Sequence, residues 1–96
     1  MSEKIRLGII GVGNMGSAHG TNIVGGRCPD FELRAVADVN PARLEWAREY
    51  LGAVECFDNA IAMLDSGKID ACMVCVPHYD HAKYAMECMK RGIHVM

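Results

Sequence analysis

The stretch IRLGIIGVGNMG, residues 5–16, carries the strongest signal for the fold of this chain. Its first half, residues 5–10, is a short apolar run that predicts a buried β-strand. Its second half has the pattern Gly-x-Gly-x-x-Gly, and the small residues that follow predict a helix from Asn14 to about Gly25. A glycine loop between a strand and a helix is the arrangement that binds the phosphates of a dinucleotide.

Each glycine of this loop has its own expected role. Gly11 permits the tight turn, Gly13 leaves room for a pyrophosphate, and Gly16 lets helix and strand approach closely. We expect the backbone amides near Asn14 and Met15 to point at phosphate, with the positive end of the helix dipole behind them. The alternative is a glycine turn that serves only backbone geometry.

Strands and helices are predicted to alternate along the remaining residues. Further strands are expected over residues 31–37, 53–57, 69–76 and 93–96. Further helices are expected from Asn40-Pro41 to Gly52, from Asp58 to Ser66-Gly67, and from His81 to Arg91 with Asp80 as its cap. Because strands separated by helices favour parallel pairing, the sequence predicts an α/β fold. We expect a Rossmann-type doubly wound parallel sheet of about five strands, as one domain over residues 1–96.

The apolar residues of two helices predict which faces turn inward. In the first helix these are Met15, Ala18 and Ile23. In the last helix they are Ala82, Ala85, Met86 and Met89.

Asp38 stands at the end of the second predicted strand, 22 residues after Gly16. A carboxylate at this place accepts hydrogen bonds from the adenosine ribose hydroxyls and repels a 2′-phosphate. Val39 follows where a phosphate-binding arginine would otherwise stand, so both residues favour NAD over NADP. Arg43, one turn into the next helix, could still reach a 2′-phosphate or stack on adenine, which leaves NADP open. The alternative for Asp38 is a carboxylate that faces solvent at a strand end.

The third motif is VCVPHYDH, residues 74–81, at the carboxyl end of the fourth predicted strand. Ligands of open α/β sheets bind at that edge. Val76, Pro77, His78 and His81 are therefore expected to form the wall near the nicotinamide. A local structural role is the alternative for either histidine, and the sequence offers no confident proton donor.

Composition narrows the class of protein. The 96 residues are 51% hydrophobic and 23% charged with a net charge of −2, which argues against disorder and against a nucleic-acid partner. The N-terminal apolar run is too short for a membrane span or signal peptide. Five cysteines, an odd number, fit reduced thiols in the cytoplasm. Cys72 and Cys75 would point to opposite faces of a strand, so neither a disulfide nor a metal site is expected.

Together these motifs resemble the N-terminal nucleotide-binding domain of the Gfo/Idh/MocA oxidoreductases, named after glucose-fructose oxidoreductase and inositol dehydrogenase. The resemblance covers essentially all 96 residues. It rests on GVGNMG with His19 shortly after it, on AVAD at residues 35–38 with Asn40-Pro41, on residues 74–81, and on KRGIHVM at residues 90–96. It implies transfer of hydride between a nicotinamide cofactor and a sugar, inositol or related polyol. Members of the family often carry Asn at the position of His78.

The resemblance also implies parts beyond these 96 residues. Family members place a Glu-Lys-Pro motif after the last strand, whose lysine helps to hold cofactor and substrate, and then a C-terminal domain for substrate binding and oligomerisation. We therefore expect this chain to be a piece of a longer enzyme, with no catalytic residue before Met96 and no turnover of its own. An open edge at the last strand favours self-association. Two alternatives stay open, a non-catalytic dinucleotide sensor and another two-domain reductase on the same fold.

Overall fold

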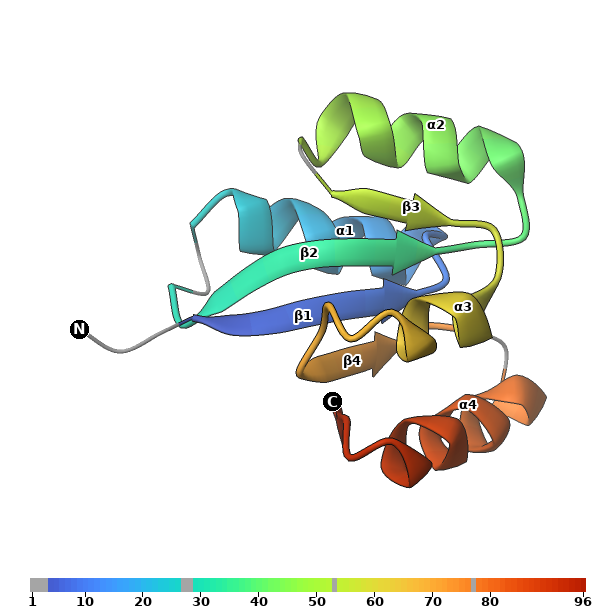
Figure 1. Cartoon of the computed structure of the whole chain (residues 1–96). Helices are drawn as coiled ribbons and strands as arrows, with labels where there is room; N and C mark the ends of the chain where they lie inside the picture. The colour runs from blue at the N-terminus through green and yellow to red at the C-terminus, as the bar shows by residue number, and fades with distance from the viewer. Residues whose placement is uncertain (1–3, 27–28, 53, 77) are drawn as a thin grey trace.

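The computed structural model describes residues 4–26, 29–52, 54–76 and 78–96, and of residues 14, 15, 78 and 79 it describes the backbone alone. Strands and helices alternate along these residues (Figure 1). The strands are β1 (Ile5–Ile10), β2 (Phe31–Ala37), β3 (Glu55–Phe57), β4 (Ala71–Val74) and β5 (His94–Val95). The helices are α1 (Asn14–Val24), α2 (Pro41–Tyr50), α3 (Ala60–Asp65) and α4 (His78–Lys90).

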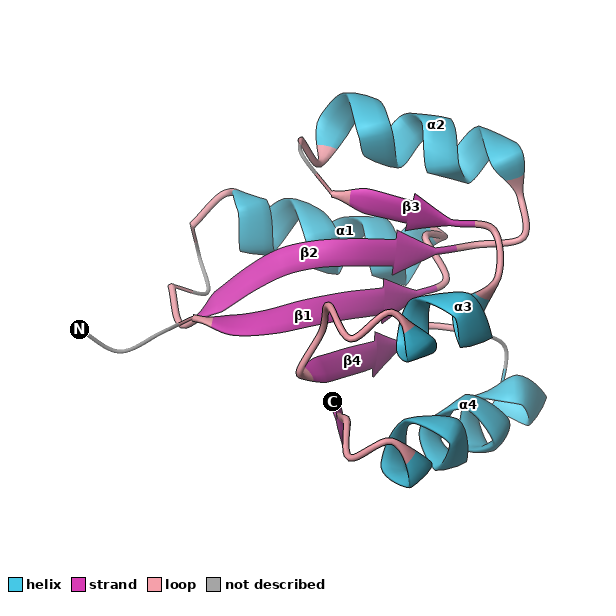
Figure 2. Cartoon of the chain, in the orientation of Figure 1, coloured by secondary structure: helices cyan, strands magenta, loops and turns pink. Residues whose placement is uncertain are grey.

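The strands form one parallel sheet in the order β3-β2-β1-β4-β5 (Figure 2). The chain winds outward from β1 to β3 and then returns to the other side of β1 with β4, so the order reverses between β1 and β4. In the registers on the two sides of β1, Ile10 lies opposite both Ala37 and Val74. The carboxyl ends of these three strands are therefore level, and the loops that follow them meet at one edge. The predicted doubly wound parallel sheet is confirmed.

The two faces of the sheet carry separate hydrophobic cores. Helices α1 and α2 cover one face, where Ile23 and Leu44 pack over Ile9 and Val36. Helices α3 and α4 cover the other face, where the core includes these buried residues: Ile10, Met63, Leu64, Cys72 and Cys88. Cover on both sides explains why the carboxyl halves of β1 and β2 and the whole of β4 are apolar.

Cys72 and Cys75 fall on opposite sides of this sheet, as the two-residue period of a strand predicts. Cys72 lies in the core under α3 and α4, whereas Cys75 packs against the core under α1 and α2. Burial raises the pKa of both thiols above the usual value. Both cysteines are free.

Helix α2 begins and ends as predicted. The side-chain oxygen of Asn40 accepts a hydrogen bond from the amide of Ala42 at 3.0 Å, and Pro41 occupies the first turn. Gly52 follows the last residues of the helix with a φ of +76°, the left-handed conformation that glycine adopts most easily.

Two other predicted helix caps are wrong. Asn59, and not Asp58, caps α3, because its Oδ1 accepts hydrogen bonds from the amides of Ile61 at 2.8 Å and Ala62 at 3.2 Å. Helix α4 begins at His78, so Asp80 lies inside its first turn instead of capping it. At the start of each of these two helices the sequence has more than one polar residue. Only the path of the folded chain decides which of them reaches the free amides of the first turn.

The inward face predicted for α4 is wrong at Ala82, Met86 and Met89, and Ala85 is half-buried. Met86 and Met89 are 55% and 64% exposed and Ala82 is exposed, whereas Cys88 is fully buried and Tyr84 packs against the core. Ala18 of α1 is exposed as well, although Ile23 is buried as expected. On both helices, apolar character alone did not identify the buried face.

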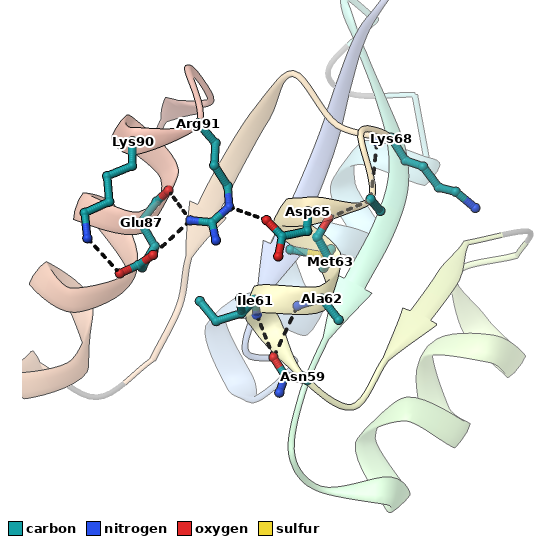
Figure 3. A network of polar contacts seen from close by, with 10 residues as sticks. Asn59, Ile61, Ala62, Met63, Asp65, Lys68, Glu87, Lys90 and Arg91 are labelled. Carbon is teal, nitrogen blue, oxygen red and sulfur yellow. Dashed lines mark hydrogen bonds and ion pairs between the residues drawn. The ribbon is translucent and has the colours of Figure 1, made fainter.

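A network of polar contacts fixes the orientation of α4 against α3 (Figure 3). The Arg91 guanidinium, just after α4, donates to the Asp65 carboxylate at the end of α3 at 2.7 Å and to the Glu87 carboxylate at 2.9 Å. Lys90 pairs with the same Glu87 at 3.4 Å. Hydrogen bonds from Arg91 and Lys90 lower the pKa of Glu87. Arg91 therefore joins the two helices that cover one face of the sheet, on which Cys88 and Tyr84 pack into the core.

Candidate functional site

The loop between β1 and α1 is held close to both neighbouring strands. The amide of Gly11 donates to the carbonyl of Ala37 at 2.8 Å, and Gly11 has a φ of +93°. A Cβ atom at this position would lie 2.5 Å from the carbonyl oxygen of Cys75, which follows β4. Only glycine combines that backbone angle with so close a neighbour. The loop is thereby fixed at the point where the order of the strands reverses.

Gly16 brings helix α1 against the same loop. A Cβ atom on Gly16 would lie 1.9 Å from the carbonyl oxygen of Gly11 and 3.4 Å from Ile9 Cγ2. The close approach of helix and strand that the sequence predicted at Gly16 is present. It directs the amino end of α1 at the carboxyl edge of the sheet.

Gly13 differs from the other two glycines because no backbone crowds it. Its φ is −84°, which other residues can adopt, and its nearest neighbour is the Arg43 guanidinium, 3.4 Å from the position of a Cβ. Gly13 is also the N-cap of α1, and no side chain caps this helix or places an acid in its first turn. The first-turn amides, at Asn14 and Met15 among others, therefore remain suited to an anionic ligand.

Asp38 links the loop after β1 to the loop after β2. Its Oδ2 accepts a hydrogen bond from the amide of Val12 at 2.7 Å, and its Oδ1 accepts one from the amide of Asn40 at 2.9 Å. The side chain is only 4% exposed. The alternative of a carboxylate that faces solvent is therefore wrong. The sequence did not show that this carboxylate also holds the glycine loop in place.

Arg43 lies across the same loop from the side of α2. Its Nη1 is 3.6 Å from Asp38 Oδ2, which makes an ion pair, and its side chain is 51% exposed. The guanidinium also lies beside Gly13. Its charge thus offsets that of Asp38 next to the place where a phosphate would approach α1.

A cavity of about 310 Å³ opens at this edge of the sheet. Six of its lining residues are Asp38, Val39, Arg43, Val76, Asp80 and Tyr84. A second hollow of about 270 Å³ lies between α1 and α2, with Gly13, Arg43 and Trp46 in its lining. Arg43 borders both. Cavities of this size with apolar walls and a few charged groups are typical of small-molecule sites.

The predicted nicotinamide wall stays a prediction, although the structure describes the surroundings of two of its residues. Val76 lines the larger cavity. His81 is exposed on α4 and is not part of that lining. Pro77 lies outside the described residues, and His78 is described only as the first backbone position of α4.

Sequence reasoning missed Asp80 and Tyr84 as members of the cavity wall. They are four residues apart and so lie on one face of α4. The spacing of four residues could have identified this pair from the sequence, but only if the helix had been predicted to begin at His78.

Two further features are absent from the described part of the chain. No group of three or more His, Cys, Asp or Glu side chains there could hold a metal ion. None of the helices described is both long and apolar enough to cross a membrane.

Comparison with known proteins gives a match over almost the whole chain. A family model described as "Oxidoreductase family, NAD-binding Rossmann fold" matches residues 5–96. The chain is 35% identical to inositol 2-dehydrogenase of Rubrobacter xylanophilus over 93% of its own length and 25% of the relative's. It is 30% identical to myo-inositol 2-dehydrogenase of Thermotoga maritima over 95% of its length and 27% of the relative's. The chain thus spans about a quarter of the length of these relatives.

Solved structures show the same likeness. The scyllo-inositol dehydrogenase of Lactobacillus casei, with bound NAD(H) and scyllo-inositol, superposes with a TM-score of 0.90 at 33% identity, covering 97% of this chain and 27% of that one. The WlbA dehydrogenase of Bordetella pertussis, in complex with NADH and UDP-GlcNAcA, gives 0.87 at 30% identity over 97% and 28%.

Proposed function

The chain belongs to the Gfo/Idh/MocA oxidoreductase family, with its NAD-binding Rossmann fold, and we propose that the edge around Gly13 and Asp38 binds NAD(H). The observation that carries this proposal is the amino end of α1. It has no capping side chain and stands behind a glycine loop that Asp38 holds through the amide of Val12. The loop and Asp38 thus meet at one place, where a dinucleotide needs a phosphate site next to a ribose site.

The residues present fit the pyrophosphate and the ribose of the adenosine diphosphate. Gly11, Gly13 and Gly16 leave the amides of Asn14 and Met15 to bind the pyrophosphate, as backbone groups that need no side chain. Each oxygen of Asp38 accepts one backbone hydrogen bond, and Oδ1, which does not face Arg43, is able to accept a second from a ribose hydroxyl.

The walls of the larger cavity supply the apolar contacts that an adenine ring needs. Val39, Val76 and Tyr84 lie in this lining beside Asp38. Pro77, His78 and His81 are proposed to border the nicotinamide, because they follow β4 at the same edge of the sheet.

For the whole protein we propose hydride transfer between the nicotinamide and a hydroxyl-bearing carbon of an inositol, sugar or related polyol. Inositol dehydrogenases are among its relatives, which supports this substrate class. The redox chemistry belongs to the bound cofactor, and the part played by these 96 residues is to bind and orient it. Substrate binding and proton transfer are assigned to further parts of the longer protein.

Three finer proposals accompany this function. NAD is preferred to NADP, because the carboxylate of Asp38 would repel a 2′-phosphate on the ribose that it is proposed to bind. The protein acts in the cytoplasm, where its thiols stay reduced, and neither a nucleic acid nor a membrane is its partner.

Copies of the chain associate through β5 at the edge of the sheet and the exposed Met86 and Met89, so light scattering should give a mass above that of one chain.

The cofactor proposal is tested by titrating the chain with NADH and following the fluorescence of Trp46, which borders the smaller hollow beside Gly13. The variant Gly13→Ala should keep its fold, because the new methyl group meets only the flexible end of Arg43. It should lose affinity by about tenfold or more, since the methyl stands where the pyrophosphate approaches.

The matched control is Gly20→Ala, the same change farther along α1, where the methyl group meets Leu51 instead of the loop. Its affinity for NADH should stay unchanged. No saturable fluorescence change up to millimolar NADH with the unmodified chain would refute the proposal.

A further inference from the structure

Asp80 is a charged residue of the proposed cofactor cavity, and the sequence predicted for it only a capping role that the structure does not bear out. It lies in the first turn of α4 and lines the same cavity of about 310 Å³ as Asp38. Its carboxylate makes no hydrogen bond or ion pair with the part of the chain that the structure describes. The cavity therefore contains a second carboxylate that no other described group neutralises.

The Asp80 carboxylate matters because it determines the net charge of the cavity lining. Asp38, Arg43 and Asp80 are the charged residues among the described ones that line the cavity. Asp38 and Arg43 form an ion pair with 3.6 Å between Oδ2 and Nη1, so these two charges largely cancel. The lining then owes its net negative charge to Asp80.

We propose that Asp80 is a second determinant of cofactor choice, which makes the cavity reject a 2′-phosphate on the adenosine ribose. This inference rests on the proposed binding of NAD(H). A ribose bound by Asp38 would place its 2′ substituent in the cavity that Asp80 lines. A phosphate group there would meet an unbalanced carboxylate inside a partly enclosed space, where charges are screened less than in open water. The uncharged 2′-hydroxyl of NADH would not be repelled.

This arrangement also accounts for Arg43, which on its own would favour a 2′-phosphate. Because Arg43 is already paired with Asp38, part of its positive charge is offset before any phosphate approaches. Asp80 opposes the same phosphate from the other wall, on α4. The two walls together favour NADH.

The test compares the affinities of NADH and NADPH for the unmodified chain and for Asp80→Asn, measured through Trp46 fluorescence at low salt. The variant removes one charge with little change of shape. We expect the affinity for NADPH relative to NADH to rise about threefold to tenfold. Asp80→Glu retains the charge and should keep the original ratio. Asp80→Ser provides a second neutral side chain if Asp80→Asn is poorly folded, as judged by circular dichroism.

Asp30→Asn is the matched control, because it removes the same charge from an exposed residue before β2, at the opposite edge of the sheet. Its ratio should match that of the unmodified chain. An unchanged ratio in Asp80→Asn and Asp80→Ser, or an equal rise in Asp30→Asn, would overturn the role of Asp80 and leave the NAD(H) proposal standing. Failure of the unmodified chain to bind either nucleotide would refute both proposals.

Discussion

Replacing Gly16 by alanine tests whether the contact between α1 and the glycine loop is as tight as the structure indicates. The new Cβ would lie 1.9 Å from the carbonyl oxygen of Gly11 and 3.0 Å from its carbonyl carbon. Cβ atoms in proteins essentially never come closer than 3.0 Å to such a neighbour, so the backbones must separate by about 1 Å. Both partners are backbone, and no side chain can turn away to relieve the overlap.

The cost of this separation sets the expected loss of stability. Overpacking a closely packed site costs about 1–3 kcal/mol, and a clash between two backbones falls at the upper end or beyond it. Alanine in place of glycine inside a helix stabilises the helix by about 1 kcal/mol, which offsets part of this cost. We therefore expect Gly16→Ala to lower the free energy of unfolding by about 2 kcal/mol or more, out of a total of about 5–15 kcal/mol. For a domain of this size, that corresponds to a fall in Tm of about 10 °C or more.

Thermal unfolding followed by circular dichroism provides the measurement, with Gly20→Ala as the matched control. Both changes add one methyl group to α1 and bring the same gain in helix propensity. At Gly20 the methyl group meets the ends of the Leu51 side chain at 3.1 and 3.2 Å, and these can shift. The Tm of Gly20→Ala should stay within a few degrees of the unmodified chain. Equal Tm values for the two variants would refute the argument from close contact at Gly16.

Three further predictions concern charged and thiol groups. Asp38→Ala should cost about 1–3 kcal/mol in urea unfolding, because the amide of Val12 loses its buried acceptor, and it should abolish NADH binding. Hydrogen bonds from Arg6 lower the pKa of Asp70 to about 2, so the stability from this pair is present above about pH 4 and is lost as pH falls through 2. The difference in urea midpoint between the unmodified chain and Asp70→Asn should therefore shrink over that range, and it should be small throughout because the pair is exposed. Burial raises the pKa of Cys72, so iodoacetamide at pH 8 should label it in the folded chain far more slowly than in denaturant, as mass spectrometry can show.

The sequence was sufficient for features that depend on neighbours along the chain. The glycine loop, the start of α2 at Asn40-Pro41 and the end of that helix at Gly52 were all predicted at the residues where the structure has them. So was the alternation that sends Cys72 and Cys75 to opposite faces. Each of these follows from backbone geometry, hydrogen bonding within a few residues or the period of a strand. Local chemistry therefore determined the order of elements and the fold class.

The tertiary structure decided what depends on packing between distant segments. The buried face of α4 is the one that packs Cys88 and Tyr84 into the core under α3 and α4, so the exposed Met86 and Met89 could not be identified from hydrophobicity alone. The bond from Asp38 to the amide of Val12 spans 26 residues. Asp80 joins the cavity only because α4 begins at His78 and packs against α3 and β4, which brings its first turn to the carboxyl edge of the sheet. A sequence pattern can place a charge on a helix, but only the folded chain brings three such charges to one cavity.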